Sequence, residues 1–175
     1  MTRLESKRSK IILLLVITIL VFAVWQIGYE PVHARILAGG TNGWLKMVGS
    51  DKSIKYEVKD NKSLFRVHIT MEGKEYTFPQ EIGPLLQPTV IIVSWQIFLF
   101  FILGWRKGLR LMLINLTIFV GLQVFFLVQL TGFHTSGFQK FLYGLMVDSF
   151  YIIALILVIK DTIFQAVFRK KSAEG

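Results

Sequence analysis

Asp148 is the most unusual residue of the sequence, because it is a carboxylate within a long run of apolar residues. A charged side chain in such a run is costly in a membrane and usually faces protein or water. Gln96 and Gln123 interrupt two other apolar runs, and Ser94 and Ser149 stand close to these positions. Counted at about 1.5 Å per residue, the two glutamines and the aspartate lie roughly 10 Å below the expected outer end of each run. The sequence therefore predicts one polar layer in the outer half of a helix bundle.

Three interpretations of this polar layer remain open. The first is structural, because polar side chains form hydrogen bonds between membrane helices and stabilise the bundle. The second is contact with a partner, in which Asp148 pairs with a basic residue of another chain; Lys140, two turns above it, reaches only partway. The third is a site for a substrate, a lipid headgroup or an ion. Asn115, nearer the opposite end of its run, is expected to form hydrogen bonds between helices.

The remaining side chains with catalytic potential form no recognisable constellation. His33, His68 and His134 are far apart, have no metal-ligand spacing, and are expected to be solvated. The sequence holds no phosphate-binding loop, no Gly-x-Ser-x-Gly and no zinc-protease helix motif. It has no cysteine, which excludes disulfides, thiolate metal sites and a cysteine nucleophile. We therefore predict no enzyme activity, no cofactor and no metal.

The elements that position the polar layer are four apolar runs. The chain is 53% hydrophobic with a mean hydropathy of +0.56, which is typical of a membrane protein. Each run is long enough to cross a bilayer core of about 30 Å, although the second is close to the lower limit. The first ends in Trp25 and Tyr29 without a small-x-small cleavage site, so we expect an uncleaved signal-anchor. The predicted spans are residues 11–28, 89–105, 111–130 and 141–160.

The distribution of Lys and Arg predicts the direction of these spans. Basic residues gather in the leader 1–10, in the turn 106–110 and around the tail 161–175. The segment 29–88 balances its basic residues with nearly as many acidic ones, and the loop 131–140 contains only one Lys. The positive-inside rule therefore puts both termini in the cytoplasm and these two segments outside, in an inner (plasma) membrane. The net charge of +9 indicates topology here and not binding of nucleic acid.

The outer segment is expected to begin with a helix. Glu30-Pro31 is a plausible start, because proline is tolerated at the first helical position. Gly39-Gly40 and Asn42-Gly43 are expected to break the helix, with a second short apolar face after them. This part either lies along the membrane surface or packs on the sheet that follows.

Alternating apolar and polar residues predict that sheet. The alternation covers 54–58, 65–70 and 76–78, with turns at 60–62 and 72–74. It indicates a three-stranded antiparallel meander with one apolar face, which the preceding helix, the membrane or a partner must cover. The predicted fold class is a mainly α membrane protein with four transmembrane helices and a small extracytoplasmic α+β domain.

This arrangement resembles the small membrane proteins that accompany exosortases, the envelope-sorting transpeptidases. The similarity lies in a basic anchor that ends in the aromatic-Pro stretch Trp25–Pro31, a β-rich outer segment, and a lead into three close spans marked by Gly83-Pro84 and Pro88. The resemblance implies an accessory role. The chain is not the sorting enzyme, which needs a cysteine.

The predicted function is a non-catalytic accessory subunit that docks on a larger membrane complex through its spans and its outer β domain. Its partners would be membrane lipids and other membrane subunits, and not nucleic acid. One alternative is a small transporter or channel-like subunit that uses the layer of Gln96, Gln123 and Asp148. Another is a membrane enzyme that acts on a lipid or a lipid-linked substrate.

Overall fold

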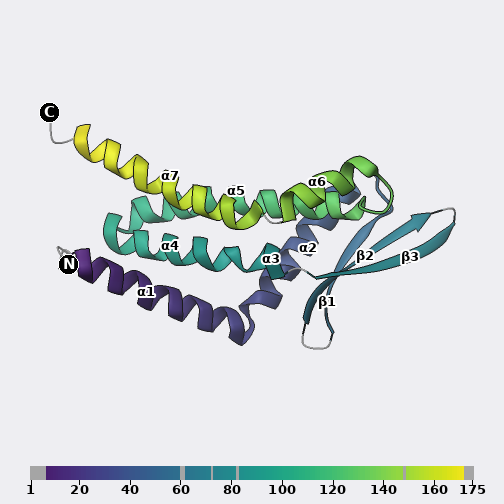
Figure 1. Cartoon of the computed structure of the whole chain (residues 1–175), viewed down its shortest axis with the longest axis horizontal. Coiled ribbons are helices and arrows are strands. Elements are labelled where there is room, and N and C mark those ends of the chain that lie inside the picture. Colours follow the sequence, from purple (N-terminus) through teal and green to yellow (C-terminus); the bar gives the residue numbers. More distant parts are fainter. Residues whose placement is uncertain (1–6, 60–61, 72, 82, 148, 172–175) are drawn as a thin grey trace.

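A computed structural model of the chain describes residues 7–59, 62–71, 73–81, 83–147 and 149–171, with side chains through Asp161 (Figure 1). Most of these residues are helical, and one small sheet stands at the end of the helix bundle. The elements are α1 (Lys7–Val24), the π-helix η1 (Trp25–Tyr29), α2 (Glu30–Met47), β1 (Ser53–Lys59), β2 (Lys62–Met71), β3 (Lys74–Glu81), α3 (Gly83–Leu86), α4 (Pro88–Leu103), α5 (Trp105–Thr131), α6 (Gly137–Val147) and α7 (Ser149–Lys171).

The first predicted span and the helix after it form one bent helical stretch of 41 residues, Lys7–Met47. The bend lies in η1, where Gly28 has a φ of 151°, a backbone conformation that side chains with a Cβ rarely adopt. The Trp25 indole Nε1 donates a hydrogen bond of 3.1 Å to Glu30 Oε2 across this bend. The bend coincides with the predicted end of the first span at residue 28.

α2 does not break at Gly39-Gly40 or Asn42-Gly43, so that prediction is wrong. A glycine inside a helix costs about 1 kcal/mol relative to alanine, and tertiary packing can offset this. Gly40 lies close to α5, where a Cβ would come within 3.2 Å of a Val124 methyl group. The neighbouring face of α2 buries Leu37 and Leu45. The glycines therefore permit close packing instead of ending the helix.

The three-stranded antiparallel meander is confirmed. Its order is β1-β2-β3, and Val67 pairs with Ile54 on one side and with Phe78 on the other. The predicted turns at 60–62 and 72–74 fall partly outside the described residues. The register keeps the apolar side chains of all three strands on one face, as the alternation predicts.

The chain itself covers most of this apolar face. Ile54, Phe65 and Ile69 are buried in one continuous core with residues of α2, α4 and α5. Asn42 of α2 binds the backbone of Ile54 twice, since its Oδ1 accepts from the Ile54 N–H at 2.8 Å and its Nδ2 donates to the Ile54 carbonyl at 2.9 Å. Of the two alternatives for this helix, packing on the sheet is the one observed.

The connection between α4 and α5 is shorter than the predicted turn at 106–110. α5 begins at Trp105, and Gly104, with a φ of 81°, is the single residue between the two helices. Gly108 packs against Phe100, so closely that a Cβ on Gly108 would lie 2.5 Å from a Phe100 ring carbon. Residues 106–110 therefore belong to the first turns of α5.

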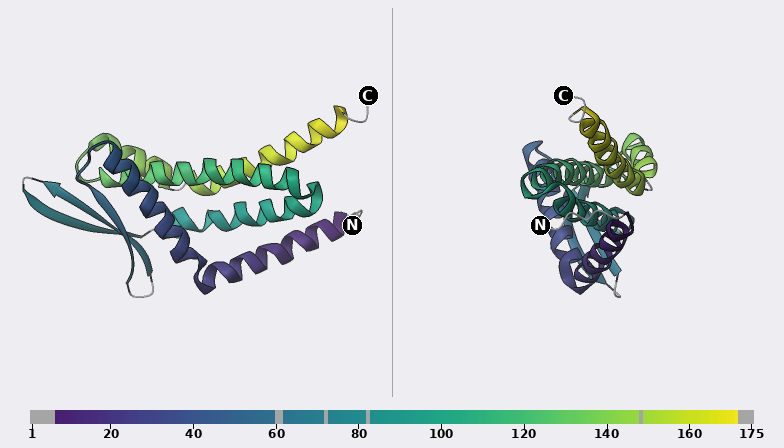
Figure 2. Two further views of the ribbon diagram at one scale, coloured as in Figure 1. Left: turned by 180° about the vertical axis from the view of Figure 1, so that it is seen from behind. Right: turned by 90° about the vertical axis from the view of Figure 1, so that its left-hand side faces the viewer.

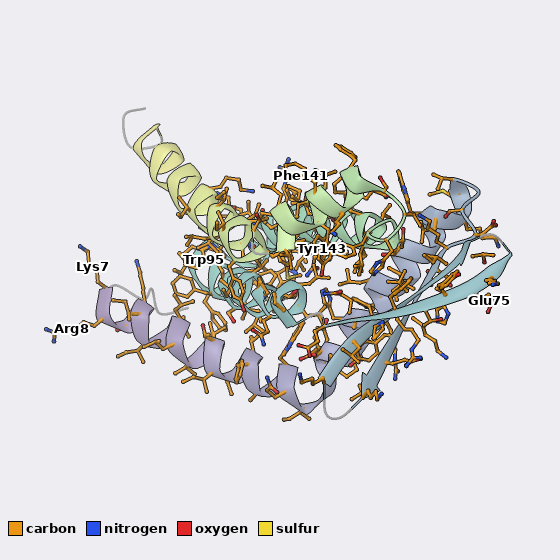
Figure 3. The ribbon with its side chains drawn as sticks, turned by 45° about the vertical axis from the view of Figure 1, so that its right-hand side comes forward. Lys7, Arg8, Glu75, Trp95, Phe141 and Tyr143 are labelled. Carbon is orange, nitrogen blue, oxygen red and sulfur yellow. The ribbon has the colours of Figure 1, made fainter. Side chains whose placement is uncertain are left out.

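Three helical stretches are long and apolar enough to cross a membrane: Lys7–Met47, Gly83–Leu103 and Trp105–Thr131. α6 and the Ser149–Asp161 part of α7 meet the same criterion only when taken together across a bend of 55°. The fourth span therefore stays a prediction. On α6, the exposed Phe141 and the buried Tyr143 lie on opposite sides (Figure 3).

The start of α1, the α4–α5 connection and the end of α7 lie at one end of the bundle, and the sheet lies at the other (Figure 1). Seen along the bundle, α1 and α7 are peripheral, and the last turns of α7 diverge from the other helices (Figure 2). The start of α1 and the end of α7 thus lie opposite the sheet, and the orientation of the chain in a membrane stays a prediction.

Candidate functional site: two polar clusters in the helix bundle

The first cluster surrounds the carboxylate of Asp161 on α7, which is 1% exposed. Its Oδ2 accepts hydrogen bonds from Gln96 Nε2 at 3.0 Å and from Asn115 Nδ2 at 2.7 Å. These two amides come from α4 and α5. One carboxylate oxygen thus joins three helices, and we call Gln96, Asn115, Lys160 and Asp161 the inner cluster.

Lys160 supplies the positive charge of the inner cluster. Its Nζ donates a 2.6 Å hydrogen bond to Asn115 Oδ1 and lies 3.6 Å from Asp161 Oδ1. The Lys160 side chain is 41% exposed, whereas that of Asp161 is 1% exposed. Within the described residues, Asp161 Oδ1 and Gln96 Oε1 are buried and accept no hydrogen bond. The ion pair is therefore open toward the surface of the bundle on the side of Lys160.

A second cluster lies nearer the sheet and joins α2, α4 and α5. His33 Nε2 lies 3.1 Å from Gln123 Oε1 and 3.3 Å from Thr89 Oγ1. The amide Nε2 of Gln123 donates to the Leu85 carbonyl at 2.6 Å and to Thr89 Oγ1 at 3.3 Å. We call His33, Leu85, Thr89 and Gln123 the outer cluster.

The outer cluster is connected to the bend and to the sheet. The ring of Trp25 is centred 5.6 Å from that of His33. Glu30, which accepts the Trp25 hydrogen bond, also accepts one of 2.5 Å from Ser63 Oγ on β2. These contacts fix the direction of α2 relative to α1 and to the sheet, which is a structural role.

The prediction of one polar layer is wrong for Gln96 and Gln123, because each belongs to a different cluster. Gln96 follows Thr89 by seven residues on α4, which is about 10 Å along a helix. Ser94 is buried without a hydrogen-bond partner among the described residues. Ser149 Oγ donates to the Leu145 carbonyl at 2.9 Å, away from both clusters. Asp148, the centre of the predicted layer, lies outside the described residues.

The histidines differ from the prediction at one position. His33 is 7% exposed and bonded in the outer cluster, so the expectation of a solvated ring is wrong there. His134 is exposed as expected, and its ring stacks on Phe78 of β3 at 4.0 Å between centroids. His68 is half-buried, and its Nδ1 lies 3.2 Å from Thr77 Oγ1.

Sequence reasoning missed Asp161, because the predicted fourth span ends at residue 160 and puts Asp161 in the tail. α7 continues to Lys171, so that Asp161 lies about ten residues, or about 15 Å, from the end of the helix. A signal was present in the sequence, since Ile163, Phe164 and Val167 resume the apolar character after the charged pair. A Lys-Asp pair followed by further apolar residues indicates a charged interruption of a helix and not its end.

The polar side chains of the two clusters mainly contact one another. Among the described residues no three His, Asp or Glu side chains lie close enough together to hold a metal ion. The polar atoms of the two clusters are amides, one hydroxyl, one imidazole and one ion pair, most of them already engaged with one another. Comparison with protein-family models, with curated proteins and with solved structures finds no match.

Proposed function

We propose that this chain is a non-catalytic subunit of the inner (plasma) membrane that docks on a larger membrane complex. Its helices cross the bilayer, both termini are cytoplasmic, and the sheet is on the outside. The arrangement of the ends supports this orientation, because the basic residues Arg106, Lys107 and Arg110 lie at the end of the bundle opposite the sheet.

The uncovered part of the sheet is the observation that carries the proposal. Val58 and Tyr76 belong to the apolar face, yet they are 60% and 40% exposed. β1 and β3 are both edge strands, and the β2–β3 hairpin projects from the bundle with Glu75 near its tip (Figure 3). Asn42 already occupies the Ile54 backbone on the β1 edge, so the β3 edge beside Tyr76 is the better candidate for pairing with another chain. The sheet therefore offers a surface for a partner on the outer side of the membrane.

A transport function is supported less well, because the two polar clusters do not form a continuous path. Ile92, on α4 between Thr89 and Gln96, is 1% exposed and belongs to the apolar core. An enzyme would need a nucleophile or an acid-base pair facing a cavity. The apolar groove between α1 and α4, about 410 Å³ in volume, is lined by side chains such as Ile17, Val21 and Ile97.

Photo-crosslinking from the sheet tests the proposal. A photoreactive amino acid at Tyr76 faces the expected partner, whereas the same residue at the exposed neighbour Thr77 points to the opposite face. We expect an adduct with another membrane protein from position 76, much weaker from position 77, and native-gel migration in mild detergent above the monomer. Migration as a monomer without an adduct from either position would contradict an accessory role.

A further inference from the structure

The exposed face of α7 has the spacing of a helix-packing surface. Ile152, Leu155, Ile156 and Ile159 are each between 45% and 60% exposed. Their spacing of i, i+3, i+4 and i+7 puts them in one stripe along the helix. We call these four residues the α7 stripe.

Lys160 lies at the edge of the α7 stripe, eight residues after its first member. The hydrogen bond of 2.6 Å to the buried Asn115 holds its ammonium against the bundle. A lysine ammonium has three N–H donors, and one is used in this bond. Because Asp161 Oδ2 already accepts from two amides and Oδ1 is 3.6 Å from Nζ, the side chains described up to Asp161 satisfy Lys160 incompletely.

The depth of this cation distinguishes the α7 stripe from other exposed apolar surface. Gln96, in the same cluster, is eight residues from Gly104, which is about 12 Å from the α4–α5 connection. Arg110, the last basic residue of this end, is six residues from Gly104, so in the proposed orientation the half-exposed ammonium lies just inside the edge of the hydrocarbon, where a charge is costly unless an anionic or polar group faces it. α1 also exposes large apolar side chains, such as Ile12 and Ile19, for which lipid alone is a suitable environment.

We propose that the α7 stripe is a docking surface for a membrane-spanning helix of another protein, and that this helix carries an Asp or Glu carboxylate facing Lys160. The inference rests on the proposed function and names the chemistry of the partner. Apolar side chains of the partner helix pack on the stripe, and its carboxylate accepts hydrogen bonds from the ammonium donors that Asn115 does not use. Charge complementarity identifies the occupant: the Asp161 carboxylate of the ion pair is buried while the Lys160 ammonium is half-exposed, so the charge that faces the partner is positive and the partner supplies an anion.

A designed membrane helix serves as the probe. Polyleucine peptides with a single Glu, Gln or Leu at the depth of Lys160 are mixed in phosphatidylcholine vesicles with the full-length protein. Energy transfer from a dye on an introduced Lys107→Cys reports association, because the chain has no other cysteine. We expect the Glu peptide to bind about tenfold more tightly than the Leu peptide, with Gln between them.

Variants assign the effect to Lys160. Lys160→Met should remove the preference for Glu, Lys160→Arg should keep it, and the control Lys140→Met should leave it unchanged. Lys140 is a suitable control because it is exposed at the start of α6, outside the α7 stripe. If Lys160→Met fails to fold, the comparison of the three peptides on the unaltered protein still tests whether the stripe prefers a carboxylate.

Four results would overturn the inference. Equal binding of the Glu and Leu peptides would show that the stripe does not select a carboxylate. Loss of the preference when phosphatidylglycerol is added would assign Lys160 to a lipid headgroup, and Lys160-dependent energy transfer between two labelled copies of the chain would assign it to a second copy. If the native complex survives in the Lys160→Met variant while the Tyr76 crosslink remains, the docking inference fails and the accessory function stands.

Discussion

At the scale of single residues, the buried Asp161 carboxylate shows how hydrogen bonds and an ion pair stabilise a charge inside the bundle. The carboxylate is nearly inaccessible to solvent. In the folded state its negative charge is stabilised by the two amide donors and the neighbouring ammonium. Removing one partner of a buried pair usually costs about 3–5 kcal/mol, because the other partner is left without compensation. The amides of Gln96 and Asn115 would lose their acceptor as well.

We expect Asp161→Ala to lower the free energy of unfolding by about 3 kcal/mol, measured by denaturation in detergent micelles. Ser94→Ala is the matched control in the same bundle, because the buried Ser94 hydroxyl has no hydrogen-bond partner among the described residues. Its removal should change stability by less than about 0.5 kcal/mol. Equal effects of the two substitutions would show that the inner cluster does not stabilise the bundle.

At the scale of elements, close packing of the α4–α5 hairpin depends on the absence of a side chain at Gly108. A Cβ there would lie 2.5 Å from Phe100 Cδ1 and 3.0 Å from Phe100 Cα, and the backbone atom cannot move aside cheaply. The single-residue connection at Gly104 allows this approach, because its positive φ reverses the chain at once. The longer predicted turn would have separated the two helices.

Gly108→Ala should therefore destabilise the protein by about 1–3 kcal/mol, as overpacking does elsewhere. Gly121 is the control on the same helix, since a Cβ there meets nothing within 4 Å. Because alanine favours a helix over glycine, Gly121→Ala should be neutral or stabilising by up to about 1 kcal/mol. Thermal unfolding of both variants in one detergent provides the measurement, and a stable Gly108→Ala would show that the hairpin is looser than described.

At the scale of the whole molecule, the proposed orientation can be tested with single cysteines, because the chain has none of its own. Thr70 is exposed on the sheet, and Lys107 is exposed at the α4–α5 end. In sealed right-side-out vesicles, an impermeant maleimide should label Thr70→Cys at once and Lys107→Cys only after permeabilisation. Labelling in the reverse order would invert the topology, and labelling of both at once would argue against a membrane between them.

The sheet and the helix bundle form one packed unit, which the bend at Gly28 and the contacts of Glu30 hold together. The sheet has no separate core, since Phe65 and Val67 share one cluster with residues of the bundle. A sheet of three strands buries too little apolar surface to be stable alone. It depends on α2 and α5, which also bear His33 and Gln123 of the outer cluster.

The sequence by itself determined the features that depend on local periodicity and charge. The alternation of apolar and polar residues predicted the strands and the side of the sheet on which Phe65 lies. The length of the apolar runs predicted the helices, and the basic residues near Arg106 marked one end of the bundle. These patterns were sufficient because each depends on neighbours within a few residues.

Only the tertiary structure decided which polar side chains meet. Gln96 binds Asp161 and not Gln123, Asn115 joins them from another helix, and His33 is buried against Gln123 and Thr89. The same cause explains the helical glycines of α2, where contact with α5 outweighs the local preference of Gly40. Depth along one helix can be counted from the sequence, but the rotation and offset of each helix against its neighbours come from packing. Because of the rotation and offset of the helices, the polar residues form two clusters instead of the predicted single layer, and the Lys160–Asp161 pair lies within the bundle.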